Sequence, residues 1–353
     1  MLISPDAGLD PRRPCAPSDS PSVSGAYAEA LRTFLLKQGL AWPEPSRPVE
    51  AIPAHRVPGS TFVRVLDDAR RNLGDPLVGL HFGIRAGAAG YGLMGVAAAT
   101  ATSLRDTIRH LHRFASLTST LGDLSSTAQS GFVSLIWNPL PGVDTAVVEA
   151  TLAGWVSFAR HLVGASAEEI GVTFAHRPCA TRQRYEQLLE CRVEFDASTH
   201  SVSVPADLLE ARPRLADGNL NAAIGNWLHE CTAAVRPCPH RPTARRVALL
   251  LGTRIPLDTG DMNAAADALH VSTRTLQRRL SAESTSFRQL LDATRAHHAI
   301  VRLLRGRTPL MQVGVEVGFS EQSSLCRAFR RWTGCSPLSL RRQLGRVYHD
   351  VRR

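Results

Sequence analysis

The chain has 353 residues, and a composition of 44% hydrophobic and 20% charged residues excludes a disordered or fibrous protein. Its net charge of +10 is uneven: residues 241–353 hold 20 Arg, no Lys and 8 acidic residues, which gives +12, whereas residues 1–240 carry −2. This split points to a polyanion as the partner of the last third, either a nucleic acid or an acidic membrane surface.

Location and redox state are predicted from what the sequence lacks. No apolar run reaches the roughly 18 residues that a membrane span needs, and the N-terminus shows no basic region followed by an apolar stretch. The seven Cys are odd in number and widely scattered, which indicates reduced thiols. We therefore expect a cytoplasmic protein of about two domains that does not associate with a membrane.

The N-terminal two-thirds predicts an α+β domain over residues 25–212. The preceding residues, 1–24, are rich in Pro and Ser and predict a disordered tail. Apolar spacing and capping signals predict helices that begin near Tyr27 and Phe62, at Asp75-Pro76 and after Ser103, and that run over 144–163 and 181–190. Strands are predicted at 121–128 and 131–138, which bracket Ser130-Gly131 as a hairpin, and at 171–174, 192–195 and 200–204.

Two features of this domain admit more than one interpretation. The glycines of Gly87–Gly95 lack the G-x-G-x-x-G order and a preceding strand, so we interpret them as a tight connection rather than a nucleotide-binding loop. Trp155, Phe158 and His161 share one helix face and fit a pocket, a dimer interface or simple core, of which core is favoured.

Residues 213–242 predict a linker helix followed by a Pro-rich connection. The helix extends from Leu215 to Val235, and the connection begins at Arg236. Its apolar face is formed by Leu220, Ile224, Trp227 and Leu228. Cys231, Cys238 and His240 are metal-ligand types, but their spacing is not that of a known zinc site, so we expect neither a metal nor another cofactor.

Residues 243–345 predict an all-α domain, followed by a basic tail at 346–353. After a short helix, a second helix with Ala265, Ala266 and Leu269 inward leads into a turn at His270. Ser272 then caps a third helix, whose apolar stripe is Leu276 and Leu280. Two short helices joined in this way form a helix-turn-helix pattern.

The helix-turn-helix pattern recurs 48 to 49 residues later. A helix over 309–316 leads to a turn at Gly318, and Ser320 is expected to cap a helix with Leu325 and Phe329 inward. Between the two copies, Ser286 to Arg305 predicts one helix about 30 Å long. Because one turn of B-DNA is about 34 Å, this helix would place the two second helices in successive major grooves.

The outward faces of the two second helices carry the residue types that read bases. Counting 100° per residue puts Arg274, Arg278 and Ser281 opposite Leu276, with Gln277 at the flank, and Ser323, Arg327 and Arg330 opposite Leu325, with Gln322 near the start. Arg binds guanine and Gln binds adenine through paired hydrogen bonds in the major groove. Phosphate contacts are expected from Ser272, Ser281, Ser320 and Arg330.

These residues carry a resemblance to a known family. Segment 241–345 resembles the DNA-binding domain of AraC/XylS-type bacterial transcription regulators, through Val271–Leu280, Thr285–Phe287, Gly318–Ser324, Arg327–Phe329, Arg331–Gly334 and Ser336-Pro337. The resemblance implies seven helices with two helix-turn-helix units. It implies base reading by Arg274, Gln277, Arg278, Gln322, Ser323, Ser324 and Arg327.

The chain departs from the pattern of this family in its second unit. Gly314 stands where Ala is usual, at a helix cost of about 1 kcal/mol, and Glu316 adds a charge. Leu325 replaces a frequent Phe, and Leu340 stands where Tyr is common. We therefore expect the second unit to be the less stable of the two, or the weaker reader.

Residues 27–235 resemble, less sharply, the arabinose-binding-type N-terminal domain of one branch of this family. The matching segments are Asp75–Leu80, Gly92–Gly95 and Ser103–Arg105. The resemblance implies a domain that senses an effector and dimerises, and it favours activation as the outcome. It does not identify the effector.

The sequence therefore predicts a sequence-specific DNA-binding transcription regulator controlled by a small molecule. Its expected partners are promoter DNA, the effector, RNA polymerase and a second copy of the chain. Two alternatives stay open: a ligand-independent regulator whose N-terminal domain only dimerises or contacts polymerase, and an enzyme tethered to DNA. No Ser-His-Asp, paired-carboxylate or H-E-x-x-H arrangement is evident to favour the enzyme.

Overall fold

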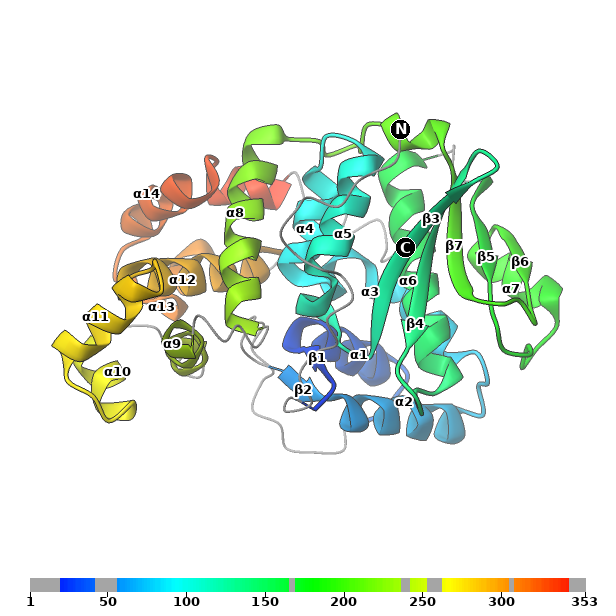
Figure 1. Ribbon diagram of the computed structural model, residues 1–353, viewed down its shortest axis with the longest axis horizontal. Helices are drawn as coiled ribbons and strands as arrows, with labels where there is room; N and C mark the ends of the chain where they lie inside the picture. The colour runs from blue at the N-terminus through cyan, green and yellow to red at the C-terminus, as the bar shows by residue number, and fades with distance from the viewer. Residues whose placement is uncertain are drawn as a thin grey trace.

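Helix α8 lies between an N-terminal α+β body and a helical C-terminal region (Figure 1). The structure, a computed structural model, describes residues 20–41, 56–164, 169–235, 242–252, 262–304 and 308–342. The expected fold class, an α+β domain followed by an all-α domain with two helix-turn-helix units, is confirmed. None of the helices in these residues is long and apolar enough to cross a membrane.

The elements of the N-terminal body are, in chain order, β1 (Ser22–Ser24), α1 (Gly25–Lys37), β2 (Arg56–Pro58), α2 (Gly59–Leu73), α3 (Val78–Gly90), α4 (Gly92–Thr100), α5 (Leu104–Thr118), β3 (Gly122–Gln129), β4 (Phe132–Pro139), α6 (Thr145–Val163), β5 (Gly171–Thr173), α7 (Arg182–Leu189), β6 (Arg192–Glu194), β7 (His200–Pro205) and the 3₁₀ turn η2 (Asp207–Glu210). The remaining helices are α8 (Gly218–Val235), α9 (Pro242–Gly252), α10 (Met262–Ala268), α11 (Thr273–Ala282), α12 (Phe287–Leu304), α13 (Leu310–Glu316) and α14 (Gln322–Thr333).

Five strands form a mixed sheet in the order β3-β4-β7-β5-β6. Neighbouring strands are antiparallel except β5 and β6, which are parallel. The predicted hairpin is confirmed, because Gln129 pairs with Phe132 across Ser130 and Gly131. These two turn residues have φ of 52° and 79°, as the tight turn that matches the twist of a hairpin requires.

Regular structure begins before residue 25, which corrects the expected boundary of the tail. Ser22–Ser24 form β1 and pair antiparallel with β2, and Ser24 caps α1 by accepting a hydrogen bond from the Tyr27 N–H at 3.1 Å. A strand of three residues is too short to show an alternating pattern, and its partner β2 begins only at Arg56. Residues 1–19 of the predicted tail lie outside the described residues.

The glycine-rich segment Gly87–Gly95 contains a tight connection between two helices, and most of its residues are helical. It spans the end of α3, which has a kink at Gly87 where φ is 53°, and the start of α4. Tyr91 forms the turn between them, and Gly92 has φ 57°. The expected connection is therefore limited to this turn, and the helical residues on either side of it correct its expected length. Every residue of α4 is buried.

Helices α3 and α6 approach each other closely through two glycines. A Cβ at Gly79 would lie 2.1 Å from the carbonyl oxygen of Ala146, and one at Gly83 would lie 2.3 Å from that of Ala150. Such distances leave no room for any side chain, so the two backbones are in direct contact at these positions.

The helix predicted as a linker packs into the N-terminal body. It begins at Gly218 rather than Leu215, and Leu220, Ile224 and Leu228 on its inner face are buried. It contacts α4 and α5 on one side and α9, α12 and α14 on the other (Figure 1). The side chain of Trp227, predicted on the same face, lies outside the described residues.

The apolar core is divided at α12. Leu290 and Leu291 near the start of α12 join α9, α10 and α11 in one cluster. Ala296, Ile300 and Leu303 further along α12 join α13, α14 and the N-terminal body in a second, continuous cluster. The first helix-turn-helix unit therefore has a core of its own, whereas the second shares one with the N-terminal body.

Candidate nucleic-acid interface

The first helix-turn-helix unit, α10 and α11, forms as predicted. Leu276 and Leu280 are buried, as are Ala266 and Leu269. Ser272 caps α11, because its Oγ accepts a hydrogen bond from the Thr275 N–H at 3.2 Å. His270 takes a left-handed conformation, with φ 55°, in the turn that sets the angle between the two helices.

The outer face of α11 presents the predicted base-reading side chains to solvent. Arg274, Gln277 and Arg278 are exposed, and Ser272 and Ser281 are exposed at the two ends of the helix. Neither Arg274 nor Arg278 forms an ion pair with any residue that the structure describes. Their guanidinium groups therefore have donors available for an outside partner.

The second unit, α13 and α14, has the predicted interior but starts differently. Leu325 and Phe329 are fully buried. The expected cap at Ser320 is wrong: the N-cap is Glu321, whose side chain makes no capping bond to the backbone. Instead, the Glu321 carboxylate accepts a hydrogen bond from the Ser323 hydroxyl at 2.9 Å. A carboxylate here opposes binding of a phosphate at the start of this helix.

The reading face of α14 is exposed, and part of it is organised by internal hydrogen bonds. Gln322, Ser323, Arg327 and Arg330 are exposed, as is Ser320, while Ser324 is half-buried. Arg327 Nη2 donates to the Ser324 hydroxyl at 3.1 Å. Both serines of this face are therefore hydrogen-bonded to neighbouring side chains. The side chains of Gln322 and Arg330 form no hydrogen bond or ion pair with any residue that the structure describes. We refer to α11 and α14 as the reading helices.

The departures of the second unit from the family pattern are compensated in the structure. Glu316 on α13 pairs with Arg302 on α12 at 2.7 Å, so its charge is balanced. A Cβ at Gly314 would lie 3.7 Å from Leu325 Cδ2, an ordinary contact. Leu340 is fully buried.

Helix α12 connects the two units. Its 18 residues correspond to about 27 Å of helix, close to the length of about 30 Å expected from the sequence. Arg331 on α14 donates to Asp292 of α12 at 3.2 Å. In the first unit, the Glu283 carboxylate, which follows α11, accepts hydrogen bonds from the Thr243 and Ala244 N–H groups at the start of α9. Both reading helices are therefore tied to their neighbours by polar contacts as well as by core packing.

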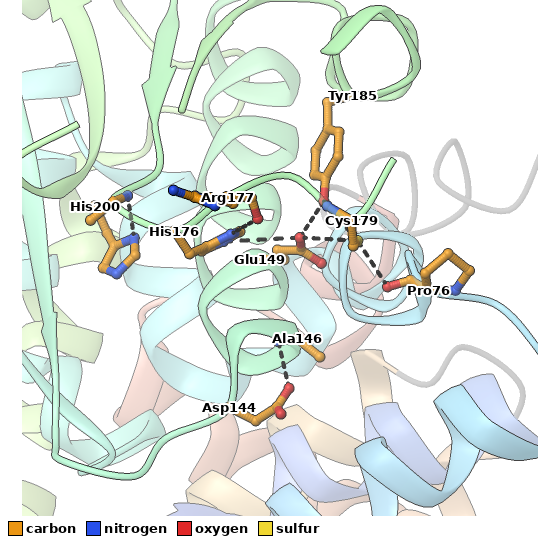
Figure 2. Close-up of polar contacts among 10 residues, drawn as sticks. Pro76, Asp144, Ala146, Glu149, His176, Arg177, Cys179, Tyr185 and His200 are labelled. Carbon is orange, nitrogen blue, oxygen red and sulfur yellow. Dashed lines mark hydrogen bonds and ion pairs between the residues drawn. The ribbon is translucent and has the colours of Figure 1, made fainter. Parts of the chain in front are cut away.

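Sequence reasoning missed a buried polar cluster around Glu149 on α6 (Figure 2). Tyr185 donates to Glu149 Oε1 at 2.5 Å, Cys179 Sγ lies 3.0 Å from the Tyr185 oxygen, and His176 Nε2 lies 4.0 Å from Glu149 Oε1. Burial raises the pKa of Glu149 to about 7, while the hydrogen bond from Tyr185 opposes the rise. The only signal in the sequence was one acidic residue within an otherwise apolar stretch of helix.

A pocket in the N-terminal body was also missed. It lies between the β4–β7 face of the sheet and helices α4, α5 and α6. Phe158 is buried in the core and Trp155 packs against it, as the favoured interpretation expects, and both also line this pocket, whereas His161 does not. Their spacing is the same as that of ordinary core residues, so the sequence alone could not separate the two.

Metal binding is not indicated in the described part of the chain. No group of three or more His, Cys, Asp or Glu side chains there is placed to hold a metal ion. The side chains of Cys231, Cys238 and His240 lie outside the described residues.

Comparison with known proteins gives two matches to family models. Residues 47–213 match the arabinose-binding domain of AraC transcription regulators, and residues 265–343 match a helix-turn-helix domain. Both positions agree with the fold described above.

Individual relatives match over most of their length. The chain is 29% identical to the ornithine utilization regulator of Pseudomonas aeruginosa, over 90% of this chain and 96% of that protein. It is 29% identical to the transcriptional regulator VirS of Mycobacterium tuberculosis, over 79% and 83% respectively. The solved structure of the transcriptional regulator CdpR from Pseudomonas aeruginosa covers 89% of this chain and 97% of its own, with 22% identity and a TM-score of 0.46.

The two model matches fall on the two domains in the expected order, and the curated relatives span both. The chain belongs to the AraC family of transcription regulators, and it carries that family's helix-turn-helix DNA-binding domain.

Proposed function

We propose that this regulator reads promoter DNA with both reading helices of one chain and that a small-molecule effector bound to the N-terminal body controls it. The observation that carries the first part is the exposed face of each reading helix, which presents Arg and Gln side chains within a segment of charge +12. Arg and Gln are the side chains best suited to paired hydrogen bonds with guanine and adenine.

The proposed roles follow the positions of the side chains. Base reading is assigned to Arg274, Gln277, Arg278, Gln322, Ser323, Ser324 and Arg327. Contacts with phosphates are assigned to Ser272, Ser281, Ser320 and Arg330. Its position supports the role of Ser272, because it caps the N-terminus of α11, where the helix dipole favours a negatively charged group. Ser320 is the weaker assignment, because it does not cap α14 and Glu321 adds a negative charge beside it.

Effector control is supported by the apolar core that the N-terminal body shares with the second helix-turn-helix unit. The pocket is lined by α4 and α5, these helices contact α8, and α8 contacts α14. A ligand that changes the packing of α4 and α5 therefore acts on the second unit through one intervening helix. We further propose that the protein activates transcription as a homodimer that contacts RNA polymerase, as the family membership favours.

The test compares two arginines on the same helix. Arg278 lies on the reading face of α11, and Arg279, also exposed, lies beside its buried face. Genome-wide footprinting of the full chain identifies bound promoters, on which Arg278→Ala should lose about 1–3 kcal/mol of specific affinity. On scrambled duplexes, Arg278→Ala and Arg279→Ala should lose equally little. Equal losses for the two variants on the footprinted promoters would exclude base reading by Arg278.

A further inference from the structure

The pocket of the N-terminal body has walls from several elements. Its space is about 500 Å³ when the open solvent at its mouth is counted, and the part enclosed by its walls is far smaller, about 30 Å³. Leu111 of α5, Leu135 of β4, Val202 of β7, and Phe158 and Ala159 of α6 contribute to its walls. Because the enclosed part is narrow, a ligand has to displace a lining side chain, and Trp155 is half-buried at this wall.

The chemistry of the lining selects against polar ligands. None of the described residues that line the pocket is charged. Thr107 contributes a hydroxyl, but it already donates to the Ala98 carbonyl oxygen at 3.0 Å. A sugar with several hydroxyl groups, or an amino acid with two charges, would lose its water contacts here without replacement.

One polar group of a lining residue is unsatisfied. The Tyr91 side chain is 8% exposed, and its hydroxyl has no hydrogen-bond partner among the described residues. Buried hydroxyl groups of Tyr usually find a partner. This hydroxyl lies against the backbone of α6, since a Cβ at Gly154 would be 2.1 Å from it, so it does not add a polar group to the surface of the pocket.

Two of the helices that line the pocket, α4 and α5, also contact α8, which in turn contacts α14 of the second unit. Met94 of α4 and Ile108 of α5 line the pocket, and Asn221 of α8 binds both of these helices. Asn221 Nδ2 donates to the Ala97 carbonyl oxygen at 2.6 Å, and its Oδ1 lies 3.0 Å from His110 Nε2. Figure 1 shows α8 between these helices and α14.

From these observations we propose that this pocket is the effector site and that the effector is an uncharged, largely apolar small molecule. The proposal rests on the effector control proposed above and names the class of its ligand. The family model is named for a sugar-binding domain, but the lining of this pocket does not provide the hydrogen bonds that a sugar needs.

The probes for the test are 8-bromo-1-octanol, which is uncharged, and 8-bromooctanoate, which has the same chain and a negative charge. Bromine quenches tryptophan fluorescence on contact, and Trp155 lines the pocket. We expect saturable quenching of the full chain by the alcohol and at least tenfold weaker binding of the carboxylate. Trp155→Phe should remove most of the alcohol-dependent quenching.

The variants fill the pocket rather than empty it. Ala159→Leu adds volume at a half-buried lining position and should weaken alcohol binding at least tenfold, with Ala159→Val in between. Ala115→Leu, a half-buried position of α5 that does not line the pocket, is the matched control and should bind as the wild type does. Circular dichroism and urea unfolding establish that each variant folds.

The outcomes separate this proposal from the proposed function. Equal affinity for the two probes, equal binding by Ala159→Leu and Ala115→Leu, or no saturable quenching would each overturn the pocket assignment. Promoter binding measured on the same wild-type samples tests the regulator independently. Probe binding in the pocket that leaves promoter binding unchanged at saturation would overturn effector control and, with it, the assignment of this pocket as the effector site.

Discussion

At the scale of single residues, Glu149 couples the stability of the N-terminal body to pH. Its side chain is 2% exposed, and burial raises the pKa of its carboxyl from 4.5 to about 7. The fold therefore favours the protonated form. Its contribution to stability is full below about pH 4.5, and it is lost as the pH rises through the folded pKa near 7.

The first prediction concerns Glu149→Gln, which removes the titration and keeps an oxygen that accepts the hydrogen bond from Tyr185. We expect the variant to exceed the wild type at pH 8 by about 1–3 kcal/mol in its free energy of unfolding, and to match it near pH 5. Urea unfolding at the two pH values measures the difference. Glu194→Gln on β6, where the side chain is exposed, should show no such change. A Glu149→Gln protein that is less stable at pH 8 would mean that the fold binds the carboxylate form.

At the scale of elements, the contact between α3 and α6 depends on glycine, whereas the glycine of α13 is replaceable. Gly83→Ala forces its Cβ against the backbone of Ala150, and we expect a loss of about 1–3 kcal/mol. Gly314→Ala makes only an ordinary contact with Leu325 and should gain about 0.5–1 kcal/mol from helix propensity. Thermal unfolding of both variants checks the opposite signs, and a destabilised Gly314→Ala protein would contradict the packing described for α13.

Elements with a clear apolar stripe could be predicted from the sequence, and those without one could not. Leu276 and Leu280 of α11 lie one turn apart behind a cap residue, and both are buried as expected. Helix α4 is buried on every side, so its sequence has no polar face to reveal a helical period. Its glycines then indicated a connection instead.

In the candidate site, the exposed faces of the reading helices could be predicted from the sequence, whereas the start of α14 and the pocket could not. The exposure of Arg274, Arg278 and Arg327 followed from the positions of their buried neighbours. The start of α14 was misplaced by one residue, because Ser is a preferred N-cap residue and Glu is not, yet the backbone geometry puts the N-cap at Glu321. The pocket was not predictable, since its walls come from segments far apart in the sequence.

At the scale of the whole molecule, the two helix-turn-helix units are coupled differently to the N-terminal body. The second unit shares its core with that body, and the first has a separate core across α12. Asn221 joins α8 to α4 and α5 through three polar contacts. Helix α8 contacts α14 directly and reaches α11 only through α9, so loosening α8 should affect α14 more than α11.

Asn221→Ala tests this coupling without any ligand. Loss of its hydrogen bonds at a half-buried position should cost about 1–3 kcal/mol locally. We expect amide hydrogen exchange to become faster in α8 and α14 and to change much less in α11. Asn138→Ala, at an exposed site on β4, is the control and should change neither helix. Faster exchange in α11 and α14 alike would indicate that the C-terminal region responds as one unit.

One chain is proposed to read two DNA sites through its two reading helices. Selection of preferred sequences from random duplexes by the wild type, Arg278→Ala and Arg327→Ala tests this proposal. Each variant should relax the preference at a different base, and the two bases should lie about one helical turn, 10–10.5 base pairs, apart. If both variants relax the same base, or if neither changes the preferred sequence, the two-site account is contradicted.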